Sequence, residues 1–518
     1  MTKQDLKQKD IYWADQVASR LIKKGKKKYV ITSGTSPSGI IHFGKLREVI
    51  TTDFVYRALK RKGVDVEFIH SYDDFDRFRK VPAGIPETYK EHIGKPLTDV
   101  PDPLGCHKNY AEHYESLFMK ELELIGISPK PIFQSKEYRL CRYKDGIKLA
   151  LQNRDKIIKI LDKYKTSSVP EDWWPVVVYC SKCGKDSTKI LEYDGKYTIK
   201  YSCKCGNEEK VDFSKKGLVK LVWRVDWPMR WWYYKIDFEP GGKDHFSAGS
   251  SYDTGKEIVK EVYNYTPPDY VIYNQVKLKG QGVKMSSSLG NVVTISDLLN
   301  IYYPEILRFL YAGVKPNKEF DLPLGEDVIK TYEDFYKVER IYFGEEKLGN
   351  KKKEEHWRRV YEMSMPFELP KRLPIQPSFR KAVNLSQIYR NDKDVIANFG
   401  LEIRDDWDKY RIETIIRNAR NWVNKYAPER YKFELKEEKH FEPTKEEQKA
   451  IKLMLIQIED NVISTEELYE VAKLSGMGKD FFKLMYKILL GKDYGPKLIN
   501  LIEMIGIDKF RAILKEYV

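Results

Sequence analysis

The sequence predicts an α/β domain built on a parallel β-sheet, followed by an all-α half. Its 518 residues far exceed the roughly 150 of an average domain, so two to four folding units are expected. A β-branched run at 27–34, a helical pattern and a second strand at 64–74 form the strand–helix–strand unit of parallel sheets. After about residue 323, charged and apolar residues alternate with helical period, and Gly400 is the only glycine in residues 350–475.

Composition and charge favour a soluble protein with a polyanionic partner. Hydrophobic residues make up 42% and charged residues 33%, and no apolar run approaches the roughly 18 residues of a membrane helix. The charged N-terminus lacks the apolar core of a secretory signal, so we expect a cytoplasmic protein without a membrane partner. The excess of 92 Lys and Arg over 77 Asp and Glu favours nucleic-acid binding, although a lysine-rich proteome gives the same excess.

The segments between these landmarks can be predicted in order. Pro and Gly predict loops over 82–110, and helical patterns fill much of 111–164. A cysteine module follows at 173–212, and an aromatic-rich segment leads to another strand at 269–280. The predicted domains are 1–322, with 173–212 as an insertion, and 323–518.

The loop after the first strand, SGTSPSGIIHFGKLREVI at 33–50, has the residues of a phosphate site. Backbone N–H groups at the start of a helix have no intrahelical partner and attract anions. Gly34 and Gly39 allow close approach of the backbone, and His42 can donate a hydrogen bond to a phosphate or ribose oxygen. A surface loop whose histidine caps the helix would show the same residues.

A second loop of complementary chemistry, GQGVKMSSSLGNVV at 280–293, again lies between a strand and a helix. Lys284 supplies positive charge, the glycines around it allow movement, and the serines offer hydroxyl groups. One such loop could be an ordinary Ser/Gly connection. Two of them in one parallel-sheet domain indicate a nucleoside triphosphate held between them.

Together these loops make the sequence resemble the class I aminoacyl-tRNA synthetases, whose ATP site lies between an H-I-G-H-type and a K-M-S-K-S-type loop. His42 keeps the first histidine, Lys45 stands where the second would fall, and Ser287 replaces the second lysine. That departure leaves more of the phosphate contact to Lys284. The resemblance implies a Rossmann-type catalytic domain in which His42 and Lys284 are catalytic. The implied ATP-binding residues are Pro37, Ser38, Gly39, His42, Gly44, Lys45, Lys284, Met285, Ser286, Ser287 and Ser288.

A closer resemblance is to the class I form of lysyl-tRNA synthetase. It is based on seven segments within residues 33–291: SGTSPSGIIHFG, HSYDDFDRFRKVP, VPDPLGCHKNYAEH, WRVDWPMRW, DFEPGGKDH, GSSYDTGKE and GVKMSSSLGN. The resemblance implies that L-lysine reacts with ATP and Mg²⁺ to form an adenylate. The lysyl group then passes to the terminal adenosine of tRNA(Lys), normally to its 2′-hydroxyl. Such chemistry depends on positioning and charge neutralisation and requires no nucleophilic side chain.

A lysine substrate needs a carboxylate or an aromatic face for its ammonium group, because burying that charge unpaired is costly. Candidates occur in WRVDW, in KDH and on the strand before the second loop. The alternative is that the tryptophans lie in the core and the aspartates cap helices. The candidates are Asp226, Trp227, Asp244, His245 and Tyr273, to which the resemblance adds Gly34 and Ser36.

Four cysteines, Cys180, Cys183, Cys203 and Cys205, have the spacing of a structural zinc site. The sequence between the two pairs predicts two strands joined by an Asp-Gly turn at 194–195. Thiolate pairs at the base of a hairpin suit tetrahedral Zn²⁺ and leave no open position for catalysis. Redox cysteines or a decayed site would have the same pattern.

A second group of possible metal ligands, Asp102, Cys106, His107 and His113, lies within twelve residues. A short loop followed by a helical histidine can close a tetrahedral site, and the resemblance implies a second zinc there. A pair of surface histidines is the alternative. Cys141 has no evident partner and is expected in the core.

The helical half is expected to bind the anticodon. By analogy with glutamyl-type class I enzymes it would be an α-helix cage that contacts a lysine anticodon. Basic and aromatic residues could pair and stack with the bases, although most of the aromatic residues are expected in the core. Examples are Arg417, Arg420, Trp422, Lys425 and Tyr426.

Two alternative functions remain open at this stage. A glutamyl-type class I synthetase would share the helical half and would need an unpaired arginine for its acidic substrate. Arg224 and Arg230 lie close to Asp226 in the sequence. A non-catalytic paralogue would bind tRNA and form no adenylate. No feature of the sequence indicates an oligomeric state.

Overall fold

The computed structural model describes residues 10–164, 168–279, 292–458 and 463–518. The chain forms two compact units, each made of three segments. Unit 1 comprises Met1–Asp297, Leu307–Leu322 and Lys347–Glu368. Unit 2 comprises Leu298–Ile306, Pro323–Glu346 and Leu369–Val518. No helix among the described residues is long and apolar enough to cross a membrane.

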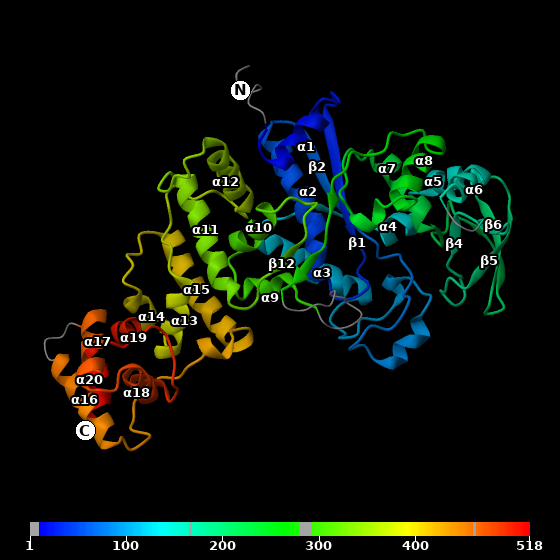
Figure 1. The fold of residues 1–518 in the computed structure, drawn as a ribbon. Helices are drawn as coiled ribbons and strands as arrows, with labels where there is room; N and C mark the ends of the chain where they lie inside the picture. Colours follow the sequence, from blue (N-terminus) through cyan, green and yellow to red (C-terminus); the bar gives the residue numbers. More distant parts are fainter. Residues whose placement is uncertain (1–9, 165–167, 280–291, 459–462) are drawn as a thin grey trace. The chain divides into compact units, whose positions relative to one another are not determined.

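A parallel sheet lies at the centre of unit 1 (Figure 1). Its strands are β1 (Lys28–Thr35), β2 (Asp65–Tyr72) and β3 (Lys130–Phe133), in the order β1-β2-β3. Parallel bridges from Ile31 to Phe238 and from Phe238 to Asp269 continue this order beyond β1. Farther along the same segments, β9 (Gly241–Gly242) pairs in parallel with β10 (Ile272–Tyr273). The carboxyl ends of these segments therefore meet at one edge, as predicted for a parallel sheet.

Helix α2 (Phe43–Arg61) connects β1 to β2 and completes the predicted strand–helix–strand unit (Figure 1). The apolar residues predicted at helical spacing are all buried: Leu46, Val49, Ile50, Phe54 and Ala58. The helix ends before Gly63, whose φ of +74° is the left-handed conformation expected after a helix C-terminus. The α/β class predicted from this segment is confirmed.

An insertion separates β3 from the segment that contains β9. Its helices are α4 (Gln134–Arg139), α5 (Lys144–Gln152), α6 (Arg154–Asp162) and α7 (Trp223–Tyr234). Its strands are β4 (Val176–Val178), β5 (Thr188–Tyr193), β6 (Thr198–Cys203), β7 (Glu208–Asp212) and β8 (Val219–Leu221). The predicted two-stranded hairpin is β5-β6, and β7 adds a third antiparallel strand. At its turn Gly195 has φ +77°, and the Asp194 carboxylate accepts hydrogen bonds from the Lys196 and Thr198 N–H groups.

The remainder of unit 1 surrounds the sheet. Its elements are α1 (Trp13–Ile22), η1 (Glu87–His92), η2 (Leu97–Asp99), α3 (Tyr110–Leu124), η3 (Lys243–His245), α8 (Ser251–Glu261), β11 (Val276–Leu278), β12 (Phe320–Leu322) and α12 (Lys351–Ser364). The prediction of a single strand at 269–280 is wrong in one respect, because this segment contains two strands, β10 and β11. The chain turns between them, where the Asn274 N–H donates to the Pro316 carbonyl and β11 pairs with β12 instead.

Unit 2 is helical throughout its described residues, as predicted. Helices α9 (Ile295–Leu299) and α10 (Pro304–Ala312) each span a junction between the units. The others are α11 (Asp327–Phe343), α13 (Phe379–Ile388), α14 (Asp392–Phe399), α15 (Asp406–Lys425), η4 (Glu429–Tyr431), α16 (Lys445–Gln457), α17 (Thr465–Leu474), α18 (Lys479–Leu490), α19 (Leu498–Ile505) and α20 (Ile507–Lys515). The fully buried Arg411 pairs with Glu339 at 2.8 Å and with Glu305 at 3.2 Å, which ties α15 to α11 and α10.

Candidate active site

A cavity of about 210 Å³ lies at the carboxyl edge of the sheet. Three separate stretches of unit 1 form its walls: the start of α2, the residues around η3, and the chain from β10 into β11. Six of the residues predicted for ATP or lysine binding are among them. The lining residues are His42, Gly44, Lys45, Gly242, Lys243, Asp244, His245, Tyr273, Gln275, Val276 and Lys277.

His42 stands at the N-cap position of α2, where its ring is oriented by the helix. Its Nδ1 atom accepts a hydrogen bond from the Gly44 N–H at 3.1 Å. A neutral imidazole that accepts at Nδ1 has its proton on Nε2, where it can donate to a phosphate oxygen. The capping role considered for His42 and the phosphate role are therefore compatible.

The residues of the second loop, Lys284 to Ser288, lie outside the described residues. Both ends of the loop are described. Before it, Val276 and Lys277 line the same cavity as His42. After it, the Val293 carbonyl accepts a hydrogen bond from the Phe43 N–H at 3.0 Å. The described residues on either side of the second loop therefore lie beside the start of α2, some 240 residues away in the sequence.

Glu48 is a site residue that the sequence analysis missed. Its Oε1 accepts a hydrogen bond from the Gly34 N–H at 2.7 Å, and its Oε2 accepts from the Tyr273 hydroxyl at 2.6 Å. Gly34 and Tyr273 are both predicted lysine-binding residues, and they lie on different strands. One carboxylate on α2 thus holds the end of β1 beside the end of β10.

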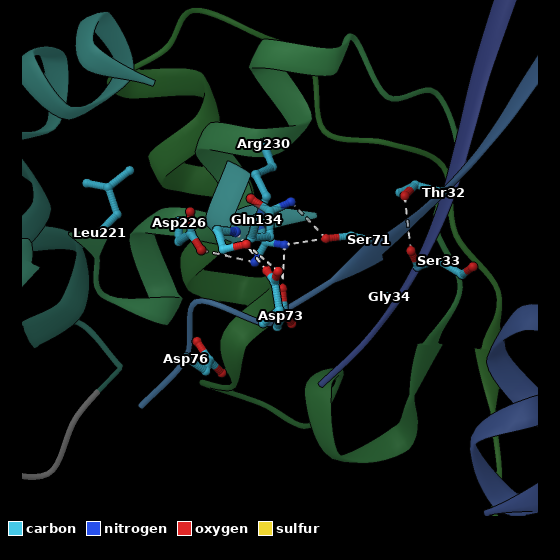
Figure 2. Close-up of polar contacts among 12 residues, drawn as sticks. Thr32, Ser33, Gly34, Ser71, Asp73, Asp76, Gln134, Leu221, Asp226 and Arg230 are labelled. Carbon is cyan, nitrogen blue, oxygen red and sulfur yellow. Dashed lines mark hydrogen bonds and ion pairs between the residues drawn. The ribbon is translucent and has the colours of Figure 1, made fainter. Parts of the chain in front are cut away.

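Asp226 lies in a buried ion-pair network at the ends of β2 and α7 (Figure 2). It accepts hydrogen bonds from the Tyr138 hydroxyl at 2.5 Å and from Arg230 Nη2 at 3.0 Å. The other terminal nitrogen of Arg230 donates to Asp73 at 2.7 Å and to Ser71 at 2.8 Å. Burial alone would lower the pKa of Arg230, but Asp226 and Asp73 together raise it. Asp226 is therefore paired internally and does not line the cavity.

The other predicted residues lie around this cavity at different depths. Trp227 is buried, stacks on Trp223 with ring centroids 5.4 Å apart, and lies 5.6 Å from the His245 ring. Burial lowers the pKa of His245, and Lys45 lowers it further, so the ring is neutral at pH 7. Ser36 and the loop residues Pro37, Ser38 and Gly39 are not among the lining residues of this cavity.

The four predicted zinc cysteines form one cluster. Their Sγ atoms lie within 4.8 Å of one another, with 3.8 Å between Cys180 and Cys205 and 3.6 Å between Cys183 and Cys203. A tetrahedral zinc with Zn–S bonds of about 2.3 Å has S–S edges of about 3.8 Å. The donor set and its spacing fit a structural zinc ion.

The second predicted group also converges. Cys106 Sγ lies 3.1 Å from His107 Nδ1 and 3.3 Å from His113 Nδ1, and Asp102 lies 3.2 Å from His113 Nδ1. The His107 Nε2 atom is hydrogen-bonded to the Ser116 hydroxyl at 2.8 Å, the kind of outer contact that orients a metal-binding imidazole. These donors fit one tetrahedral cation.

The chain is similar to several known proteins. The family described as tRNA synthetases class I (K) matches residues 11–366, which is more than half of the chain. The lysine–tRNA ligase of Borrelia garinii subsp. bavariensis is 42% identical over 98% of this chain and 100% of its own. That of Thermococcus kodakarensis is 44% identical over 94% and 96%. A solved glutamate tRNA ligase from Elizabethkingia meningosepticum covers 95% of this chain and 99% of its own, at 14% identity and a TM-score of 0.42.

The fold and the two-sided cavity define an aminoacyl-tRNA synthetase of class I. Within that class, the chain belongs to the family of tRNA synthetases class I (K).

Replacing His42 separates its catalytic role from its capping role. His42→Ala should slow adenylate formation by about 100-fold or more, because a donor to the phosphates is lost. It should also cost about 0.5–2 kcal/mol of stability through the lost N-cap. His42→Asn restores a capping acceptor, so it should recover the melting temperature without the rate. Equal activity of His42→Asn and the wild type would contradict the catalytic role.

Arg230→Met should destabilise unit 1 by about 3–5 kcal/mol, because it leaves Asp226 and Asp73 buried without their cation. Chemical denaturation followed by tryptophan fluorescence measures the change. The control is Lys200→Met, which removes the exposed ion pair to Glu208 and should leave stability nearly unchanged. A small effect of Arg230→Met would show that Lys220, 3.5 Å from Asp226, suffices for that carboxylate.

Proposed function

We propose that this chain is a lysine–tRNA ligase, which activates L-lysine with ATP and transfers it to the 3′-terminal adenosine of tRNA(Lys). Membership of the class I (K) family supports the reaction class, and the relatives named lysine–tRNA ligase match over nearly the whole chain. The observation that supports the proposal most directly is the shared cavity, because ATP-loop residues and predicted lysine-binding residues line it together. Since this reaction supplies ribosomes, we propose a cytoplasmic location.

In the first step, a lysine carboxylate oxygen attacks the α-phosphorus of ATP and pyrophosphate leaves. In the second step, the 2′-hydroxyl of the terminal adenosine attacks the carbonyl carbon and AMP leaves. His42 would donate from Nε2 to a phosphate oxygen, and Lys45 and Lys284 would offset negative charge as it shifts onto the pyrophosphate.

Mg²⁺, when bound, would supply positive charge that offsets the negative charge of the phosphates. The exposed carboxylate of Asp244 in the cavity wall is an oxygen donor of the type that this ion accepts. We assign ATP binding to Pro37, Ser38, Gly39, His42, Gly44, Lys45 and the residues Lys284 to Ser288 of the second loop.

Lysine is favoured over glutamate by the arginines near the pocket. A glutamate substrate would need a guanidinium group without a carboxylate partner, but Arg230 is paired with both Asp73 and Asp226. Arg224, which donates to the Thr254 hydroxyl at 3.3 Å, is not among the residues that line the cavity. We therefore assign Gly34, Ser36, Trp227, Asp244, His245 and Tyr273 to the lysine site, and we assign Asp226 to holding Arg230.

We propose that both clusters of metal ligands bind zinc with a structural role. Each supplies four protein donors, which leaves no open coordination position for substrate. The cysteine cluster would fix β5, β6 and β7 within the insertion. The second cluster would tie the loop at Asp102 to helix α3.

We further propose that unit 2 contacts the anticodon of tRNA(Lys). Trp422 is fully buried and donates from its indole to the Leu324 carbonyl at 2.8 Å, so it belongs to the core. Arg417 and Lys425 are exposed on the same helix, α15, and are available to phosphates or bases. An anticodon site on the exposed face of α15 would bind the RNA mainly through its phosphate charge, because the buried Trp422 cannot stack on a base.

Exchange of radiolabelled pyrophosphate into ATP tests the proposed reaction. Lysine should support exchange in the presence of tRNA, whereas glutamate should not, because no arginine among the described residues lines the cavity. The assay needs both amino acids in parallel, with and without tRNA. Exchange with glutamate alone would identify a glutamyl-type enzyme, and retention of tRNA without exchange in any amino-acid mixture would identify a non-catalytic paralogue.

Elemental analysis of the purified protein should find two zinc ions per chain. Cys183→Ser and His107→Ala should each remove one, and Cys183→Ser should also lower the melting temperature because structural zinc stabilises folding. Cys141→Ser is the matched control, since Cys141 lies outside both clusters, and it should keep both ions. Two ions retained in Cys183→Ser would contradict the cysteine site.

A further inference from the structure

Two carboxylates beside the predicted lysine site form no direct ion pair with a described residue, although Lys45 acts on Glu48 and Arg230 acts on Glu239 from a greater distance. Glu48 accepts only from the Gly34 N–H and the Tyr273 hydroxyl, both neutral groups. Glu239 accepts from the Trp231 indole N–H at 2.6 Å. Both residues stay partly exposed although they lie among buried residues of the sheet and α7.

The two carboxylates influence each other and the same tyrosine. Burial raises the pKa of Glu239 to about 7, the Trp227 and Trp231 indoles lower it, and the charge of Glu48 raises it further. Burial also raises the pKa of Tyr273, with Glu48 and Glu239 as further causes. Two partly buried carboxylates that repel each other in this way are stabilised when a cation binds between them.

Glu239 lies close in the chain to a residue that lines the cavity. Gly242 lines the cavity, and Glu239 precedes it by three residues, about 10 Å of extended chain, toward the interior of the sheet. An extended lysine spans a similar distance from its carboxylate to its terminal ammonium. When the carboxylate of the lysine substrate lies at the ATP loop, where it reacts, its terminal ammonium thus lies near Glu239. The indole rings beside Glu239 also favour a cation.

We propose that Glu239 binds the terminal ammonium of the substrate side chain and thereby selects lysine, with the charge of Glu48 behind it. This inference rests on the proposed function, which supplies the substrate. Glu48 is in addition a positioning residue, because it fixes Gly34 and Tyr273 relative to each other. Specificity then follows from charge, since a neutral side chain of equal length leaves both acids unpaired.

Glu239→Gln is the decisive variant, because glutamine keeps the volume and the acceptor for Trp231 but removes the charge. It should raise the KM for lysine by about 30-fold or more, with the KM for ATP unchanged. Norleucine, which has the lysine side chain without its nitrogen, is the second probe. The inhibition constant of norleucine should be the same for Glu239→Gln and the wild type, because norleucine has no terminal ammonium for Glu239 to bind. Glu257→Gln, which removes a carboxylate from the surface of α8, is the control.

The pH dependence of lysine binding gives an independent readout. Below pH 7 Glu239 is largely protonated and no longer attracts the lysine ammonium electrostatically, while that ammonium stays charged. Lysine affinity measured by calorimetry should therefore rise from pH 6 to pH 8 in the wild type and lose this rise in Glu239→Gln. The charged groups that act on Glu239 are Glu48 on α2 and Arg230 on α7, with Tyr273 on β10 nearby.

Each outcome separates this inference from the proposed function. Lysine-dependent exchange by the wild type with an unchanged lysine KM in Glu239→Gln overturns the inference alone. Weakening of lysine and norleucine together in that variant assigns Glu239 a structural role and also overturns it. If Glu239→Gln does not fold, Glu48→Gln decides, because its amide oxygen can still accept from the Gly34 N–H and its NH2 group can donate to the Tyr273 hydroxyl. This variant should still weaken lysine more than norleucine. Failure of the wild type to use lysine overturns the proposed function.

Discussion

Parallel pairing of β1 with β2 determines where the groups of this site lie. Parallel strands require a crossover, here α2, and they bring their carboxyl ends to the same edge. The crossover begins at that edge, so the N-terminus of α2 and His42 face the cavity. The bridges through Phe238 bring a later part of the chain to the same place. Residues more than 200 positions apart thus become neighbours.

Charge compensation near this edge takes two forms. At the ends of β2 and α7 the chain supplies its own cation, because Arg230 joins Asp73 to Asp226 and neutral hydroxyl groups complete the network (Figure 2). At Glu48 and Glu239 the chain supplies only neutral donors. The first arrangement fixes the insertion against the sheet. The second leaves an unbalanced negative charge, which costs stability in the free protein and favours a cationic ligand.

Features encoded in short stretches could be predicted from the sequence. The βαβ unit, the burial of one face of α2, the Asp-Gly turn at 194–195 and both metal clusters each lie within a stretch of about 45 residues or fewer. The roles of Glu48 and Glu239 could not be predicted in this way. Glu48 contacts Tyr273 from 225 positions away, and nothing in the sequence around either residue indicates that partner. Their significance appears only when the sheet brings three segments together.

For Asp226, the sequence contains a nearby indication of an ion pair that the prediction of a lysine ligand passed over. Its place beside Trp227 suggested a lysine ligand, but Arg230 lies four residues later, the spacing at which an acid and a base pair on one helix face. The helix therefore turns Asp226 toward Arg230 rather than toward the cavity. A carboxylate with a built-in cation has little attraction left for a substrate ammonium. The acids to expect in a site that selects a cation are those whose hydrogen-bond partners are neutral, as at Glu48 and Glu239.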